Sequence, residues 1–265
     1  MKKFNKHLFH VLEPSLWPFF LASGIFFFVT GLAFSIHYIN KGYYLIILSI
    51  CILLFISLAW FLDISREAVI DGYHSQIVRN GIKLGFLFFI VSEIMLFFGF
   101  FWAFFHASLS PSIEIGSIWP PRGLNAIAIF EFPLYNTFLL IISGFSVTWA
   151  HRGICLGFFR NAIDGLLLTI CLGLFFILLQ GLEYYDSTFN LSDGVYTCVF
   201  FLLTGLHGLH VIIGVIFLFG CLVSLFSNSF LDTHYLRFIL AVWYWHFVDI
   251  VWILLFLTLY CWGSW

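Results

Sequence analysis

The sequence predicts an all-α integral membrane protein with seven transmembrane helices. Of its 265 residues, 62% are hydrophobic and only 9% are charged, whereas a soluble domain is about 25% charged. Mean hydropathy is +1.06, and the apolar residues gather in seven runs near the roughly 20 residues that a spanning helix needs. The few charges include no basic run of the kind that holds nucleic acid.

Polar or proline-rich breaks separate the seven runs. Asn40-Lys41-Gly42 predicts a turn, and Trp119-Pro120-Pro121 marks a longer loop. Pro18 and Pro133 stand near helix starts, where a missing N–H is tolerated. No proline follows Pro133, so the last three helices are expected to be unbroken. We expect helices over 17–39, 43–62, 77–107, 130–152, 160–185, 195–226 and 236–262, in a single membrane domain, 1–265.

Lysine and arginine predict the orientation of these helices. Nine of the 11 basic residues fall on one side of the predicted membrane, and only Lys41 and Arg122 fall on the other. Cytoplasmic or matrix loops carry the excess of basic residues. The N-terminus is therefore expected inside, and an odd number of crossings places the C-terminus outside. The six cysteines form no C-x-x-C pair and favour buried apolar packing over disulfides or metal binding.

Glu93 is the one formal charge in the apolar run 84–105. It lies ten residues beyond Lys83, about 15 Å along a helix. An acid at that depth costs about 2.5–3.5 kcal/mol by insertion scales. A packed partner or a function is therefore expected, and the sequence leaves both hypotheses open.

Four further polar residues are expected within the membrane at similar depth. They form two pairs spaced i, i+3, and each pair shares a helical face: His207 with His210, and His246 with Asp249. A metal or haem site, a proton path and interhelical hydrogen bonding are three hypotheses for this set. The spacing favours hydrogen bonding between helices, because no cysteine pair or haem-spanning histidine pattern accompanies the histidines.

The charged segment 63–83 is expected at the inner headgroup level. Cations beside interfacial aromatic residues can hold an anionic lipid headgroup, and a solvated loop is the equal alternative. The residues concerned are Trp60, Phe61, Arg66, Glu67, His74, Arg79 and Lys83.

Seven segments, in order and over nearly the whole chain, carry a family resemblance. They are HLFHVLEPSLWP, SREAVIDGYHS, SEIMLFFGFFWAFFHASLSPSIEIGSIWPPRG, PLYNTFLLIISGFSVTWAH, LLQGLEYY, SDGVYTCVFFLLTGLHGLHVIIG and WYWHFVDIVWILLFLTLYCWG. With these segments the sequence resembles subunit III of cytochrome c oxidase, the haem–copper terminal oxidase.

The resemblance implies a fold, partners and cofactors. It implies two first helices splayed from the other five, with phospholipid in the cleft between them. It implies a non-catalytic core subunit that binds no haem, copper or other metal. Such a subunit packs on subunit I, near subunit II and supernumerary subunits. Stabilising subunit I, supporting proton uptake and helping oxygen access are the implied roles in an oxidase that pumps protons.

The resemblance also assigns individual residues. Glu93 falls at the family's carbodiimide-reactive intramembrane acid, and Arg66, Glu67 and His74 fall at its lipid-contacting positions, near Trp60. Two departures stand out. His151-Arg152 replaces a common histidine pair, and Ile239 replaces a common acid. Without that acid, Arg237 is expected to find another partner or a lipid phosphate.

Two alternatives and the compartment remain as hypotheses. One alternative is an independent transporter or proton channel that uses Glu93, His207 and His246, and the other is a bis-histidine haem carrier.

The 37 phenylalanines suggest an organelle-encoded chain. We therefore expect the mitochondrial inner membrane, with the N-terminus in the matrix and the C-terminus in the intermembrane space; a bacterial plasma membrane is the alternative.

Overall fold

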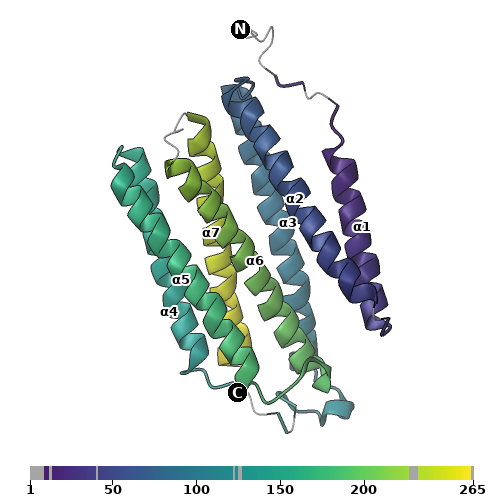
Figure 1. Ribbon diagram of the computed structural model, residues 1–265. Helices are drawn as coiled ribbons and strands as arrows, with labels where there is room; N and C mark the ends of the chain where they lie inside the picture. The colour runs from purple at the N-terminus through teal and green to yellow at the C-terminus, as the bar shows by residue number, and fades with distance from the viewer. Residues whose placement is uncertain are drawn as a thin grey trace. The chain divides into compact units, whose positions relative to one another are not determined.

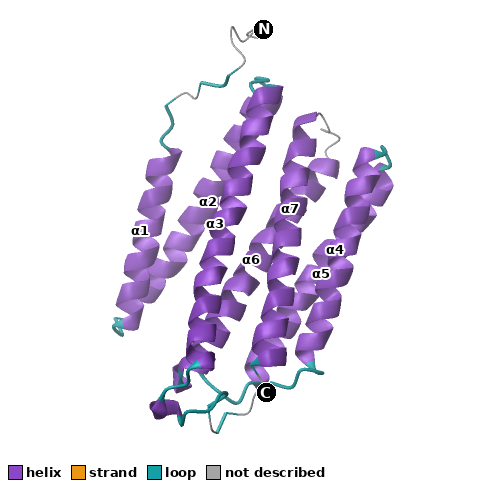
Figure 2. Ribbon diagram, turned by 180° about the vertical axis from the view of Figure 1, so that it is seen from behind, coloured by secondary structure: helices purple, strands orange, loops and turns teal. Residues whose placement is uncertain are grey.

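The structure is a computed structural model that describes residues 9–11, 14–39, 41–121, 123–124, 127–226 and 232–263. The described part consists of helices and loops, without strands (Figure 2). Seven of its helices are long and apolar enough to cross a membrane, which confirms the predicted fold class. They are α1 (Trp17–Ile36), α2 (Lys41–Val69), α3 (Gln76–Leu109), α4 (Phe132–Cys155), α5 (Phe159–Asp186), α6 (Val195–Phe226) and α7 (Asp232–Leu255).

The chain forms two compact units, Met1–Ile82 and Lys83–Trp265. In the first unit, α1 and α2 lie side by side as an antiparallel pair (Figure 1). Gly31 permits their close approach, because a Cβ there would lie 3.0 Å from the backbone nitrogen of Ile46. Near the other end of the pair, the Trp17 indole donates to Asp63 Oδ2 at 3.1 Å. The single domain expected from the sequence stays a prediction.

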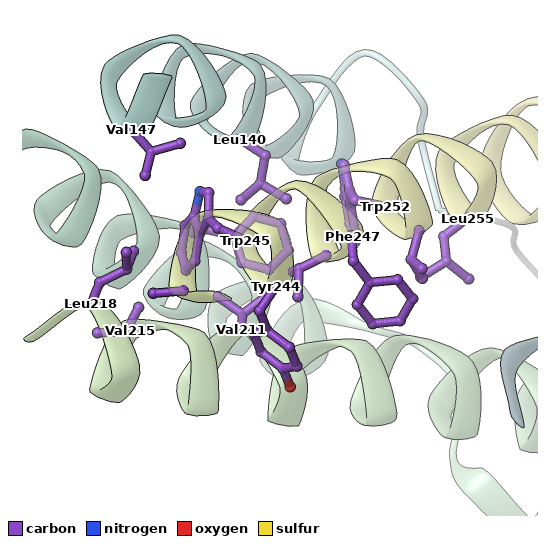
Figure 3. Close-up of a cluster of buried hydrophobic side chains, with 14 of the residues drawn as sticks. Leu140, Val147, Val211, Val215, Leu218, Tyr244, Trp245, Phe247, Trp252 and Leu255 are labelled. Carbon is purple, nitrogen blue, oxygen red and sulfur yellow. The ribbon is translucent and has the colours of Figure 1, made fainter. Parts of the chain in front are cut away.

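In the second unit, α4, α5, α6 and α7 pack in a ring, each against the next, with α7 against α4 closing it. The apolar core lies inside this ring, with side chains of α4, α6 and α7 interleaved (Figure 3). The α3 helix contributes aromatic side chains: Phe86 meets Phe217 of α6, and Phe89 stacks on Tyr244 of α7.

Trp245 of α7 lies at the centre of this ring and is fully buried. Its ring occupies space left by two glycines. A Cβ at Gly173 of α5 would lie 2.7 Å from Trp245 Cη2, and one at Gly214 of α6 would lie 2.9 Å from Cε3. Its indole N–H donates to Ser143 Oγ of α4 at 2.9 Å. One side chain thereby contacts all three neighbouring helices.

Each predicted helix is present in the structure, but several begin or end at other residues than predicted. The second helix continues to Val69 rather than ending at residue 62, and the third begins at Gln76, so residues 70–75 alone connect them. Hydropathy locates the apolar span, but a helix can continue through polar residues at the headgroup level, where water satisfies its side chains.

The last helix also differs from the unbroken helix that we expected. After Leu255 it continues as a π-helical segment, η3 (Phe256–Trp262). The Gly263 N–H donates to the Thr258 carbonyl at 2.8 Å. Leu259 and Tyr260, within this segment, are both buried. The sequence of residues 256–262 contains no proline or other pattern from which we predicted a π-helical turn.

Gly214→Ala is expected to destabilise the second unit by about 1–3 kcal/mol, because its methyl group would overpack the enclosed Trp245 ring. Gly220→Ala on the same helix is the matched control, since a Cβ there meets nothing within 4 Å. Alanine improves helix propensity equally at both positions. Thermal unfolding in detergent measures the difference, and equal midpoints for the two variants would contradict this packing.

Candidate functional site

Glu93 has a partner that the sequence did not identify. Its Oε2 lies 2.8 Å from Nε2 of His210, so α3 and α6 meet through a carboxyl–imidazole pair. The His210 side chain is 8% exposed and the Glu93 side chain 20%. Phe97 lies against the imidazole, with ring centroids 5.2 Å apart. Both side chains of the pair are therefore largely buried between α3 and α6.

The hydrogen bonds of His210 fix how many protons this pair holds. His210 Nδ1 lies 2.7 Å from the Leu206 carbonyl, which can only accept, so Nδ1 carries a proton. His210 Nε2 and Glu93 Oε2 must then share one further proton to form their 2.8 Å bond. Whether it resides on oxygen or nitrogen, the pair is neutral overall. A neutral pair removes most of the cost of placing an acid in the membrane.

His207 does not join this pair. It is fully buried, and its Nε2–H donates to the Val248 carbonyl of α7 at 3.2 Å. Its ring packs against Phe176 and Trp252, with centroids 5.4 and 5.2 Å away. This geometry favours the hypothesis of hydrogen bonding between helices for His207.

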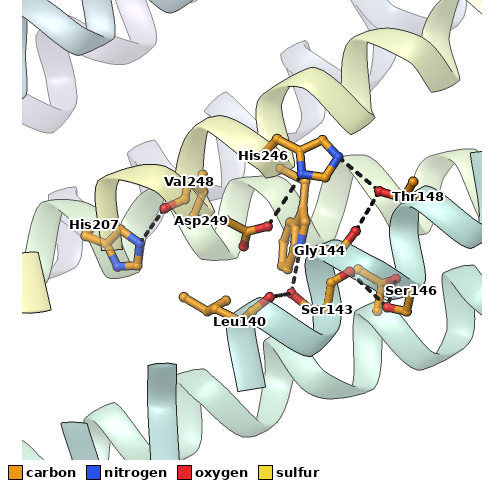
Figure 4. A network of polar contacts seen from close by, with 11 residues as sticks. Leu140, Ser143, Gly144, Ser146, Thr148, His207, His246, Val248 and Asp249 are labelled. Atoms are coloured by element: carbon orange, nitrogen blue, oxygen red, sulfur yellow. Dashed lines mark hydrogen bonds and ion pairs between the residues drawn. The ribbon is translucent and has the colours of Figure 1, made fainter. Parts of the chain in front are cut away.

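His246 and Asp249 form a second carboxyl–imidazole pair, at the seam between α7 and α4 (Figure 4). His246 Nδ1 lies 3.7 Å from Asp249 Oδ2. His246 Nε2 lies 3.4 Å from Thr148 Oγ1 of α4. The four polar residues therefore do not meet at one place, although the sequence places them at similar depth. They form separate contacts with α3, with the α7 backbone and with α4.

Three headgroup-level residues of the first unit, Glu67, Tyr73 and His74, lie around His10. The His10 ring stacks on Tyr73 at 5.0 Å and lies 5.9 Å from His74. His10 Nε2 is 4.0 Å from Glu67 Oε2. Burial lowers the pKa of His74, and the charges of His10 and Arg79 lower it further. His74 is therefore a neutral hydrogen-bonding group at neutral pH.

Arg66 points away from Glu67, since successive helical residues do not share a face. Its side chain is exposed, one turn after the exposed Leu62. Trp60 is half-buried, whereas Phe61 is exposed. Arg237 has a protein partner in the second unit: its Nη1 donates to Ser224 Oγ of α6 at 3.2 Å.

The second unit also contains a buried polar cluster that was not predicted from the sequence. Tyr260 donates to Glu183 Oε1 at 2.6 Å, and Glu183 is 2% exposed. Asn136 Nδ2 donates to Gln180 Oε1 at 3.4 Å. The spacing of Gln180 and Glu183, three residues apart on α5, was the available signal. Among the described residues, no group of three His, Cys, Asp or Glu side chains could hold a metal ion.

These features define a multi-pass membrane protein whose intramembrane acids are paired with hydrogen-bonding partners. The profile of the cytochrome c oxidase subunit III family matches residues 7–264. Cytochrome c oxidase subunit 3 of Myxine glutinosa is 46% identical over 258 residues, covering 97% of this chain and 98% of the relative. The subunit 3 of Triticum aestivum is 43% identical over 260 residues, 98% of each chain.

The chain therefore belongs to the cytochrome c oxidase subunit III family. Family membership makes it a subunit of a terminal oxidase, an oxidoreductase complex, in which this subunit is itself non-catalytic.

Glu93→Gln is expected to change the stability of the second unit by less than about 1 kcal/mol, because the amide can still donate to His210 Nε2. Glu93→Leu should cost about 1–3 kcal/mol, since that nitrogen then loses its only side-chain partner. Ser92→Ala is the control on α3, because among the described residues the Ser92 hydroxyl bonds to the Phe89 carbonyl of its own helix and to no other helix. Thermal unfolding compares the three, and a Glu93→Leu variant as stable as wild type would contradict the pairing.

Proposed function

We propose that this chain stabilises the catalytic subunit I of cytochrome c oxidase and retains phospholipid beside it, in the mitochondrial inner membrane. The family match supports a place in the oxidase. Subunit I is the proposed direct neighbour, with subunit II and supernumerary subunits in the same complex. The haems and copper belong to those partners, and phospholipids are the only bound groups that we propose for this chain.

The exposed Arg66 side chain carries the lipid proposal. It follows the apolar span of α2, and it shares a helix face with the exposed Leu62. A guanidinium above an apolar side chain suits a lipid phosphate, with its acyl chain lying along the helix. His74, neutral because its pKa is lowered, adds a hydrogen-bonding group to this end of the unit rather than a charge.

The proton count of Glu93 and His210 supports an accessory role for Glu93. A neutral pair held by the Leu206 carbonyl is a stable arrangement that links α3 to α6. We propose that it preserves the helix packing during repeated turnover. An independent channel would need a continuous polar path, whereas Phe97 and Phe247 pack directly on His210.

For orientation, we propose the N-terminus in the matrix and the C-terminus in the intermembrane space. Seven membrane-spanning helices and the distribution of lysine and arginine support this arrangement.

Arg66→Ala in the intact complex is expected to lose an anionic phospholipid that co-purifies with wild type, because the exposed guanidinium is the proposed phosphate ligand. Lys41→Ala, at the opposite end of the same helix, is the matched control. Mass spectrometry of extracted lipids measures the difference. Equal lipid content in the two variants would refute the assignment.

Glu93→Leu, which removes the bond to His210, is expected to leave the initial oxygen consumption of the complex near the wild-type rate and to shorten the period over which that rate is sustained, whereas Glu93→Gln should resemble wild type in both. The reason is that this chain carries no electrons, whereas its packing supports subunit I. An oxygen electrode follows both quantities. Immediate collapse of oxygen consumption would overturn the accessory role.

A further inference from the structure

The seam between α4 and α7 exposes polar side chains at membrane depth. His246 is 41% exposed, and Thr148 beside it is exposed as well. The exposed side chains of α5 at comparable depth are apolar, among them Leu167, Leu174 and Leu178. An exposed imidazole in hydrocarbon is costly, so this seam, unlike the apolar α5 face, holds polar side chains that require a partner or a function.

Hydrogen-bond directions fix the protonation of His246. The Thr148 hydroxyl donates its single proton to the Gly144 carbonyl at 2.8 Å. Thr148 Oγ1 can therefore only accept from His246 Nε2, 3.4 Å away, so Nε2 carries a proton. Nδ1 then faces Asp249 Oδ2 at 3.7 Å, and either atom can bind one further proton. With that proton the pair is neutral, and without it the pair carries one negative charge.

The Asp249 carboxylate of this pair packs closely against α4. Gly144 makes space for the carboxylate, because a Cβ there would lie 2.8 Å from Asp249 Oδ2. Asp249 Oδ1 is buried and has no hydrogen-bond partner in the described part of the chain. Among the described residues, no lysine or arginine forms an ion pair with Asp249, whose partner is His246.

The elements around the pair bring few other titratable groups to it. From α6, the nearby His207 is already bonded to the Val248 carbonyl. From α4, His151 lies close enough to His246 for their charges to interact. From α3, apolar side chains such as Leu87, Ile90 and Ile94 line the groove beside His246.

His151 connects the pair to the end of the span. It lies three residues from Thr148 on α4, on the same helical face. Its Nε2 is 3.4 Å from the Tyr235 hydroxyl of α7, which is 3.3 Å from Cys155 Sγ. Cys155 is the last residue of α4 and is exposed. Polar side chains of two helices thus follow the seam from the α4–α5 loop to Asp249, about 16 Å along α4.

We propose that His246 and Asp249 form an exchangeable one-proton site, reached along this seam from the α4–α5 loop. The loaded pair is neutral. Unloading breaks one O–H or N–H bond and leaves aspartate beside a neutral imidazole, while the proton passes by way of Thr148, His151 and Tyr235 to water. No electron moves. The site is separate from Glu93 and His210 and goes beyond the proposed function.

Infrared difference spectra of the intact complex in lipid nanodiscs, recorded across a pH titration, test the site. Wild type is expected to show a protonation change that Asp249→Asn abolishes. Thr148→Val should shift the pH of that change, because it removes the acceptor for His246 Nε2–H while keeping the side-chain volume. Thr258→Val is the matched control, since Thr258 also donates to the carbonyl four residues earlier, at 2.8 Å.

The site is overturned if Asp249→Asn titrates like wild type, or if Thr148→Val and Thr258→Val give the same spectra. Should Asp249→Asn fail to assemble, the two threonine variants decide, since both positions lie outside the core.

The route to the site is tested separately. Tyr235→Phe should slow hydrogen–deuterium exchange of the Asp249 signal, and an unchanged rate refutes the route. Whether the chain belongs to the oxidase is tested independently of this site, by haem co-purification and by oxygen consumption.

Discussion

The contact of Trp245 with three neighbouring helices organises the second unit. Lipid chains are as apolar as leucine, so transmembrane helices gain little from hydrophobic burial against one another. Their association relies on close packing and interhelical hydrogen bonds. Trp245 supplies both, because Gly173 and Gly214 admit its ring and Ser143 accepts its N–H. The α7 helix repeats the pattern further along, where Trp252 donates to Thr137 Oγ1 at 3.0 Å.

The central position of α7 explains why the polar residues separate into distinct sites. The fixed Trp245 orients the neighbouring positions of the helix in different directions. Tyr244 lies against His210, whereas His246 turns toward Thr148 on α4. Val248 presents its carbonyl to His207. A set of histidines and acids that could have formed one cluster is thereby divided among three helix contacts.

Both carboxyl–imidazole pairs follow one electrostatic rule. A hydrogen bond holds the far nitrogen of each imidazole protonated: Leu206 does so for His210, and Thr148 does so for His246. The near nitrogen of His210 lies 2.8 Å from Glu93 and shares one proton with it, so that pair has no net charge. The corresponding atoms of His246 and Asp249 are 3.7 Å apart. The pairs differ in exposure, because aromatic rings enclose His210 while His246 lies at an open seam. This difference favours a packing role for the first pair and proton exchange for the second.

The sequence by itself determined the seven spans, because apolar runs of that length have few stable alternatives in a bilayer. It also located Glu93, since one charge in an apolar run is conspicuous. Only the tertiary structure decided that His210 is its partner, because spacing along one helix says nothing about which face meets another helix. The π-helical turn that brings Tyr260 to Glu183 and the extension of α2 to Val69 were likewise undetermined. Both depend on hydrogen bonds and packing between distant segments, which hydropathy does not record.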